Sequence, residues 1–521
     1  MTAAVWQWIR KRERLLAYGL GSSVIALWTL LRFFTQRTIF DLVSQQVIVH
    51  QWLHGTMTAA HMGLTAYVPK MLLLYVPLDL LPGSPRLKLI LLTLAVNITT
   101  FVLLGLVAEK ILREFGVPIR RMFYAALLWL SVIAGSVFWI EFTNSRNLEV
   151  VGGLFWIYLG LRHLRRPSWR LLIGMVAFGS LLFFDDPLQF YMSALPLAAY
   201  AVGLLITKKH AVKTVAELVG VTLVAYLGSK LVFVSAEHLL QLSFSDTGGS
   251  TVPHINLAWM RQSVTGSAKS ALSLFAGDAT AGQLRKVLNL GLLLLGVVGM
   301  GYAFLRRLMP QRLAALIGCM VVIDMVVYVL GGQAVQGAAT SRYLIMLAPA
   351  FLVAVGTVQL PRNAQRPVAI VLACVVCLNL ATLGGTLQKR WDISFPQDAH
   401  IESAYRYTLA HPEVHAYASA DTAMSLLYLH NLPAAKMLPV GCLAGRVVRT
   451  HYSMDREFAR NARAGKAIAA IVFDGEVITN NPNACTPATI ATQLGKPLAL
   501  QRSDDGSLIM LYRQSNVRLP D

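Results

Sequence analysis

Long runs of apolar residues, separated by short polar segments, fill the first three quarters of the chain. A membrane-spanning helix needs about 20 apolar residues. The stretches that approach this length cover residues 13–35, 87–107, 121–141, 149–164, 171–184, 188–207, 214–235, 288–305, 312–331, 342–360 and 367–386. The pattern predicts a mostly α-helical protein, with a polytopic transmembrane helix bundle of about eleven spans.

The pattern changes near residue 387, where short helix-type and strand-type segments begin to alternate. We expect a helix over 400–410 and strands over 414–418, 467–473 and 507–512. The remaining length is enough for one small domain. The sequence therefore predicts two domains, a transmembrane bundle over 1–386 and a small soluble α/β domain over 387–521.

Composition agrees with a membrane protein, because 55% of the residues are hydrophobic and only 14% are charged. A soluble domain carries about 25% charged residues, so a disordered chain and an ordinary cytosolic enzyme are excluded. The net charge of +20 is compatible with nucleic-acid binding. However, the basic residues cluster in short segments between the apolar runs, and we expect no nucleic-acid partner.

The basic clusters also predict the orientation, since cytoplasmic loops are rich in Lys and Arg. A cytoplasmic N-terminus places every cluster on the cytoplasmic side: Arg10, Lys11, Arg12 and Arg14; Lys110, Arg113, Arg120 and Arg121; Arg162, Arg165, Arg166 and Arg170; Lys208, Lys209 and Lys213; Arg306, Arg307 and Arg312; Arg362 and Arg366. With eleven spans, the C-terminal domain is then external. We predict a multi-pass protein of the cytoplasmic (inner) membrane with a periplasmic C-terminal domain. In that oxidising compartment Cys442 and Cys485 could form a disulfide, although a pair of free thiols fits equally well.

The first external loop contains two apolar segments that are too broken to span the membrane. Residues 40–54 have apolar side chains at helical spacing and are followed by Gly55, which can end a helix. Residues 67–81 are apolar but interrupted by two prolines. We expect both segments to form helices that lie in the outer interface. Asp41 begins the first of them.

The second external loop is short, reads FTNSRNLE over residues 142–149, and holds Arg146 and Glu149. Asp41 and Glu149 are thus predicted on the same face of the membrane. Such acids can act as a general base toward a hydroxyl or amine acceptor. They can also hold a divalent cation such as Mg²⁺ or Mn²⁺. Alternatively, Asp41 caps a helix and Glu149 is a solvated loop acid.

This layout resembles the integral-membrane glycosyltransferases of the GT-C superfamily. The segment FDLVSQQVIVHQWLHG, with Asp41, resembles their first-loop pattern, and RNLE resembles their second-loop pattern, with Glu149 where Asp is more usual. The resemblance implies transfer of a sugar from a polyprenyl-phosphate-linked donor to a glycan, lipid or protein acceptor at the outer face of the membrane. It also implies that Asp41 and Glu149 are catalytic.

A departing phosphate requires cationic partners, and a charge within a span suggests function. The candidates are Arg342, Lys230 and Arg146, with Arg342 preferred because of the resemblance. In the alternative reading, Arg342 anchors the end of a span, and Lys230 forms a structural ion pair with Asp324.

Three further residues are weaker candidates for contacts with the acceptor. Asp185 and Asp186 precede Pro187 in a predicted external turn, which explains them without a functional role. His54 follows His50 at the i, i+4 spacing of metal ligands, although an amphipathic role is simpler. Residues 237–287 are expected to form a mobile external loop that could close over the donor or acceptor.

Two other classes of function compete with the transferase. A transporter or flippase of lipid-linked glycans would require a site at the membrane midplane, and a non-catalytic envelope protein would use the C-terminal domain to bind a partner. A polymerase or ligase of carrier-linked glycans shares the chemistry of the transferase. The sequence does not identify the sugar, the acceptor or the length of the carrier.

Overall fold

The computed structural model describes the chain in segments. They are residues 3–35, 40–54, 60–62, 69, 71–133, 147–208, 211–240, 242–244, 257–276, 283–330, 344–359, 367–368, 370–379, 381, 399–419, 437–443, 445–449, 468–473, 485–502 and 508–519. The chain forms two compact units. The first contains Met1–Arg32, Thr93–Phe233 and Gly249–Lys389, and the second contains Phe33–Leu92, Val234–Gly248 and Arg390–Asp521. The predicted domain boundary at residue 386 stays a prediction.

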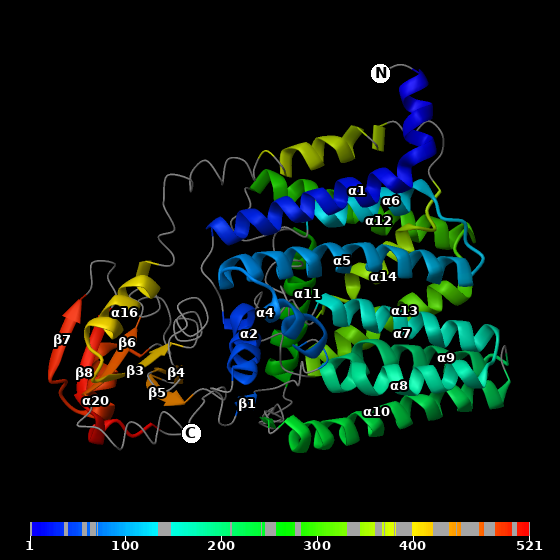
Figure 1. The fold of residues 1–521 in the computed structure, drawn as a ribbon. Coiled ribbons are helices and arrows are strands. Elements are labelled where there is room, and N and C mark those ends of the chain that lie inside the picture. The colour runs from blue at the N-terminus through cyan, green and yellow to red at the C-terminus, as the bar shows by residue number, and fades with distance from the viewer. Residues whose placement is uncertain are drawn as a thin grey trace. The chain divides into compact units, whose positions relative to one another are not determined.

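The first unit is helical (Figure 1). Its helices include α1 (Ala3–Thr35), α5 (Pro85–Glu114), α6 (Arg121–Ile133), α7 (Asn147–Arg165), α8 (Trp169–Asp185), the π-helical turn η2 (Phe190–Ala194), α9 (Leu195–Ile206), α10 (Val212–Leu240), α11 (Leu257–Ala276), α12 (Gln283–Leu305), α13 (Gln311–Leu330) and α14 (Leu347–Val355). Each predicted span contains described helix, which confirms the mostly α-helical class. Four described helices are long and apolar enough to cross a membrane: Pro85–Glu114, Val212–Leu239, Lys286–Leu305 and Gln311–Leu330.

Helix α14 lies in the core of this unit, and every residue from Leu347 to Val355 is buried. The ring of Phe351 contacts Trp129 of α6 and Phe275 of α11, with a centroid distance of 5.5 Å to each. Gly296 of α12 permits this packing, because a Cβ at that position would overlap the Phe351 ring. The core therefore joins helices from distant parts of the sequence.

Helix α11 corrects the expectation of a loop over residues 237–287. Its serines at positions 263, 267 and 270 are fully buried, and the helix packs against α12 and α13. The hydroxyl of Tyr328 on α13 donates to Ser270 at 3.1 Å. Small side chains at this spacing form a flat helix face that a neighbouring helix can approach closely. The hydropathy pattern missed the helix because this face is small and polar rather than apolar.

A buried carboxylate joins α1, α5 and α6 near the basic ends of these helices. Glu109 of α5 is 1% exposed. It forms ion pairs with Arg14 at 3.0 Å and with Arg113 at 3.2 Å. The Tyr18 hydroxyl donates to the same carboxylate at 3.0 Å. Paired and hydrogen-bonded in this way, the charge can remain buried, and it fixes α1 against α5.

The second unit contains the predicted interfacial segments of the first loop. Helix α2 (Phe40–Leu53) agrees with the predicted helix, and the π-helical turn η1 (Met71–Tyr75) continues into α4 (Val76–Leu80). Both η1 and α4 pack against α2. A short strand β1 (Ala60–Met62) pairs in parallel with β2 (Leu242–Phe244), from a segment about 180 residues later in the chain.

The C-terminal domain contains a mixed six-stranded sheet of order β5-β4-β3-β6-β8-β7 (Figure 1). The strands are β3 (Val414–Ser419), β4 (Met437–Leu443), β5 (Arg446–Arg449), β6 (Ile468–Phe473), β7 (Ala499–Arg502) and β8 (Leu508–Arg513), and the helices are α16 (Ala399–Ala410) and α20 (Pro487–Leu494). The predicted helix and the three predicted strands are confirmed as α16, β3, β6 and β8. The domain is therefore an α/β domain, as expected.

A disulfide between Cys442 and Cys485 links β4 to the start of α20, with a sequence separation of 43 residues. This decides between the two alternatives that the sequence left open. Next to the bridge, the Gln493 side chain accepts from the Val447 amide at 2.8 Å and donates to the Val447 carbonyl at 2.9 Å. Helix α20 thus covers one end of the edge strand β5.

Candidate functional site at the acidic helix ends

Three carboxylates lie near one end of the first unit, where α7 begins and α8 ends. Glu149 is in the first turn of α7 and is 2% exposed, while Asp185 and Asp186 are 7% and 1% exposed. The burial contradicts the simpler reading in which Glu149 is a solvated loop acid. The predicted turn at Asp185 and Asp186 is present, because the Gln189 amide donates to the Asp186 carbonyl at 3.0 Å. A carboxylate at the first turn of a helix is favoured by the helix dipole, which gives a local reason for the position of Glu149.

The chain direction at Asp186 follows from its neighbours. Pro187 disfavours helical geometry in the preceding residue, and Asp186 has extended backbone angles of −141° and 101°. The amide of Leu188 donates to the Asp186 carboxylate at 3.1 Å. The chain then re-enters a helix through η2, and π-helical turns occur frequently at functional sites.

Two adjacent glycines bring α7 close to this turn. A Cβ at Gly153 would overlap Oε1 of Gln189 and would lie 3.1 Å from Cβ of Ser193. Gln189 in turn donates to Asp186 at 3.5 Å. Because Glu149 is one helical turn before Gly153, it lies on the same face of α7. The structure therefore places Glu149 on the face of α7 that packs against η2, and Gln189, directly before η2, donates to Asp186.

Sequence reasoning missed Gln189, which is 1% exposed. The available signal was its position directly after the Asp-Asp-Pro-Leu turn, but an uncharged amide in a loop gives no indication of its burial. Its Oε1 accepts no hydrogen bond from the described part of the chain. A buried amide of this kind can still bind a polar ligand.

Lys230, one of the predicted phosphate-binding residues, lies on α10. It is exposed, and its ammonium nitrogen is 5.5 Å from the centroid of the Tyr226 ring. The Tyr226 ring contacts Phe190 of η2 at 4.7 Å. Asp324 is 1% exposed on α13, and within the described residues no ion pair joins it to Lys230. The structural pairing of these two residues is thus wrong, and the phosphate-binding role of Lys230 stays a prediction.

Other predicted site residues lie outside what the structure describes. Arg146 and Arg342 fall outside the described residues, as does the side chain of Asp41, whose backbone is the second residue of α2. The convergence of Asp41 with Glu149 stays a prediction. His54 is described and lies beside His50 and Asp79 in the second unit.

Buried carboxylates of this kind can bind a divalent cation. Mg²⁺ and Mn²⁺ prefer several oxygen ligands in close proximity. Among the described residues, Glu149, Asp185 and Asp186 do not form a set with ligand atoms within 4.8 Å of one another. These three acids alone therefore do not fit a metal site.

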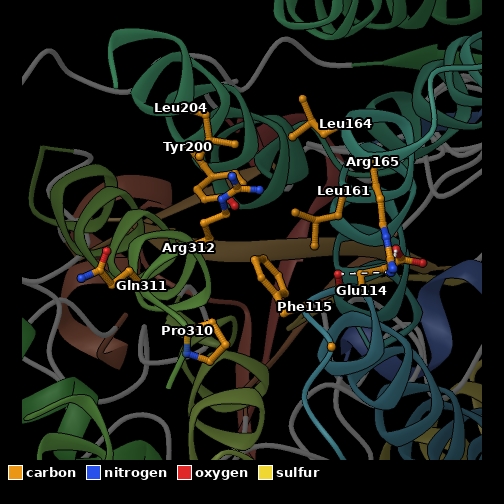
Figure 2. A pocket seen from close by; sticks show the side chains of 11 residues that line it. Glu114, Phe115, Leu161, Leu164, Arg165, Tyr200, Leu204, Pro310, Gln311 and Arg312 are labelled. Atoms are coloured by element: carbon orange, nitrogen blue, oxygen red, sulfur yellow. Dashed lines mark hydrogen bonds and ion pairs between the residues drawn. The ribbon is translucent and has the colours of Figure 1, made fainter. Parts of the chain in front are cut away.

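A cavity of about 660 Å³ lies near the opposite end of α7 (Figure 2). It is lined by Glu114, Phe115, Gly116, Leu161, Leu164, Arg165, Tyr200, Leu204, Pro310, Gln311 and Arg312. Figure 2 shows Arg165 directed toward Glu114, with an ion-pair distance of 3.3 Å. Leu161 is twelve residues beyond Glu149 on α7, which corresponds to about 18 Å along the helix. The cavity is thus separate from the acidic ends.

Of the comparisons with known proteins, the one with solved structures gives a match. No family model matches the chain, and no curated protein matches it. Among solved structures, the crystal structure of ArnT from Cupriavidus metallidurans bound to undecaprenyl phosphate is similar, with a TM-score of 0.54 and 12% sequence identity over 99% of each chain. This similarity shows that the chain has the GT-C fold. Together with its apolar helices, the fold defines a multi-pass membrane protein.

Proposed function

We propose that this protein is a membrane glycosyltransferase. It transfers a sugar from a polyprenyl-phosphate-linked donor to a glycan, lipid or protein acceptor at the outer face of the cytoplasmic membrane. The observation that carries the proposal is the GT-C fold over the full length of the chain. The solved structure with this fold was determined with undecaprenyl phosphate bound, which supports a lipid-phosphate donor. Buried Glu149 at the start of α7 supplies a carboxylate for the chemistry.

In the proposed reaction an acceptor hydroxyl or amine attacks the anomeric carbon of the sugar. The new bond to the acceptor forms as the bond to the phosphate oxygen breaks, and the electron pair leaves with the polyprenyl phosphate. Asp41 orients the acceptor and takes its proton, with assistance from Glu149. Arg342, Lys230 and Arg146 stabilise the negative charge of the leaving phosphate. No step depends on a metal.

Two observations support catalysis at the outer face. The ion pair Arg14–Glu109 and the cavity with Arg165 and Arg312 bring several basic clusters to one end of the helices, and such clusters are typical of the cytoplasmic side. The acids of α7 and α8 lie at the other ends. In addition, the disulfide of the C-terminal domain fits an oxidising compartment.

The test uses purified protein in liposomes with synthetic polyprenyl-phosphate sugars as donors and envelope extracts as acceptors. We expect a new glycosidic linkage, detected by mass spectrometry, and release of polyprenyl phosphate. Asp41→Asn should abolish transfer without lowering expression. Glu413→Gln is the matched control, because Glu413 is an exposed acid of the C-terminal domain, and it should retain activity.

Movement of an intact lipid-linked glycan across the bilayer, without a new bond, would instead identify a transporter. Full transfer activity of Asp41→Asn would remove the catalytic assignment of this residue. Loss of activity in both Asp41→Asn and Glu413→Gln would show that acid substitutions act through folding rather than through the site.

A further inference from the structure

Three potential metal ligands meet between the two helices of the first loop. His50 and His54 lie one turn apart on α2, and Asp79 lies on α4. Nδ1 of His50 is 3.1 Å from Oδ2 and 3.2 Å from Oδ1 of Asp79. Nδ1 of His54 is 3.9 Å from Oδ2 of the same carboxylate. One ligand atom from each residue can be chosen so that all three lie within 4.8 Å of one another.

These separations suit a transition metal. Zinc binds nitrogen and oxygen at about 2.0–2.2 Å in tetrahedral geometry, which separates neighbouring ligand atoms by about 3.3 Å. The distance of 3.1 Å from Nδ1 of His50 to Oδ2 of Asp79 is close to that value, and the ligand atoms of all three residues lie within 4.8 Å of one another. Two imidazoles and one carboxylate are also ligands that zinc accepts, while Mg²⁺ and Ca²⁺ prefer oxygen alone.

Hydrogen bonds around the cluster hold the ligands in place. Nδ1 of His54 lies 2.7 Å from the His50 carbonyl. Donation of the Nδ1 proton to this oxygen leaves the lone pair on Nε2, and metal-binding histidines commonly have such a backbone partner. On the other side, the Lys88 ammonium donates to the Asp79 carbonyl at 2.6 Å and fixes the start of the next helix relative to α4.

The burial of the cluster leaves one side open. The Asp79 side chain is 7% exposed, whereas those of His50 and His54 are 25% and 57% exposed. Val47 of α2 and Tyr75 of η1 are 1% and 2% exposed, and they belong to the buried apolar contact between these two elements. Three protein ligands with one accessible side allow a water molecule to complete the coordination.

We propose that His50, His54 and Asp79 form a binding site for one divalent transition metal of the zinc class. The metal fastens α2 to α4. Asp41 precedes His50 by nine residues, or about 13.5 Å of helix, so the metal supports the helix that carries Asp41 without contacting the proposed reaction. The site is independent of the proposed function, because metal binding is measured on the protein without donor or acceptor.

The experiment measures metal binding by the full chain in detergent. The protein, free of any histidine tag, is treated with a chelator, dialysed and titrated with Co²⁺ and then Zn²⁺. We expect one equivalent per chain, with the visible absorption of four-coordinate Co²⁺ that Zn²⁺ abolishes. His50→Ala and Asp79→Asn should each weaken binding at least tenfold. His238→Ala removes an exposed histidine of α10 and should leave binding unchanged.

A fourth variant separates a lost ligand from a lost fold. Asp79→His retains a metal ligand at this position and should bind Co²⁺ with a shifted spectrum. Binding by the wild-type protein that is no stronger than in Asp79→Asn would overturn the proposal, and the cluster would then be an Asp–His ion pair. Equal loss of binding in His238→Ala would also overturn it.

Discussion

Replacement of Gly153 by alanine tests the contact between α7 and η2 that positions the acidic ends. The new Cβ would overlap Oε1 of Gln189 and would approach Cβ and Oγ of Ser193 to 3.1 and 3.3 Å. Ser193 is fully buried and its hydroxyl donates to the Gln189 carbonyl at 2.5 Å. Neither side chain can move away without losing packing, so the amide of Gln189 should be displaced from Asp186.

The expected change in the free energy of unfolding follows from two opposing effects. Overpacking of a filled contact costs about 1–3 kcal/mol. Alanine also lowers the backbone entropy loss and favours a helix interior by about 0.5–1 kcal/mol relative to glycine. Gly174→Ala is the matched control, because no atom lies within 4 Å of a Cβ at that exposed position of α8. The control should therefore gain stability, and Gly153→Ala should be about 1–3 kcal/mol less stable than the control.

The assay is denaturant or thermal unfolding of both variants in the same detergent, followed by the transferase assay. Gly153→Ala should also lose activity, while Gly174→Ala should keep it. Equal stability of the two variants would refute the close approach of α7 and η2. Reduced stability with full activity would retain the packing contact but separate it from the proposed site.

Three further predictions concern other parts of the molecule. Tyr18→Phe removes the hydroxyl that donates to buried Glu109 and should destabilise the protein by about 1.5–3 kcal/mol, whereas Tyr302→Phe, at an exposed position, should be neutral in the same unfolding assay. Cys442→Ser opens a covalent loop with a sequence separation of 43 residues. The chain-entropy relation predicts that the free energy of unfolding of the C-terminal domain falls by about 4 kcal/mol. Unchanged protease resistance of that domain would contradict this prediction. Burial raises the pKa of the Tyr512 phenol, so its contribution to stability is complete below the unfolded pKa of about 10 and is lost as the pH rises through the higher folded value. Tyr512→Phe should make unfolding less sensitive to pH above about 10, and an identical pH profile for both proteins would refute the assignment.

The sequence predicted the elements whose signal is local. Apolar runs identified helix in every proposed span, and β3, β6 and β8 were found because each is a short, nearly continuous apolar run in the interior of the sheet. Strands β4, β5 and β7 were missed. Strands β5 and β7 form the two edges, and the apolar run of the interior strand β4 is interrupted by Pro439 and Gly441. The residues of β7, Ala499–Arg502, are mostly exposed, and their pattern therefore resembles a loop.

The candidate site depended on tertiary contacts that no local pattern contains. The position of Glu149 on α7 was predictable, but its burial accompanies the close packing of this helix, in which Gly152 faces Leu182 of α8 and Gly153 faces Ser193 of η2. Likewise, the spacing of His50 and His54 suggested a metal, whereas Asp79 joins them only when α4 folds back on α2. Charge and spacing in the sequence therefore identified candidate site residues, but the packing of the helices determines which of these residues lie close together.

The pairing of β1 with β2 has a consequence for biosynthesis. Ala60 aligns with Leu242, so β1 cannot pair until about 180 further residues have been synthesised. At about 5–20 residues per second, this takes about 9–36 s. During this delay its backbone amides and carbonyls lack their β2 partners. The nascent protein should consequently pass through a stage in which this segment is sensitive to proteases and chaperones, and that stage should end once β2, directly after α10, has been synthesised.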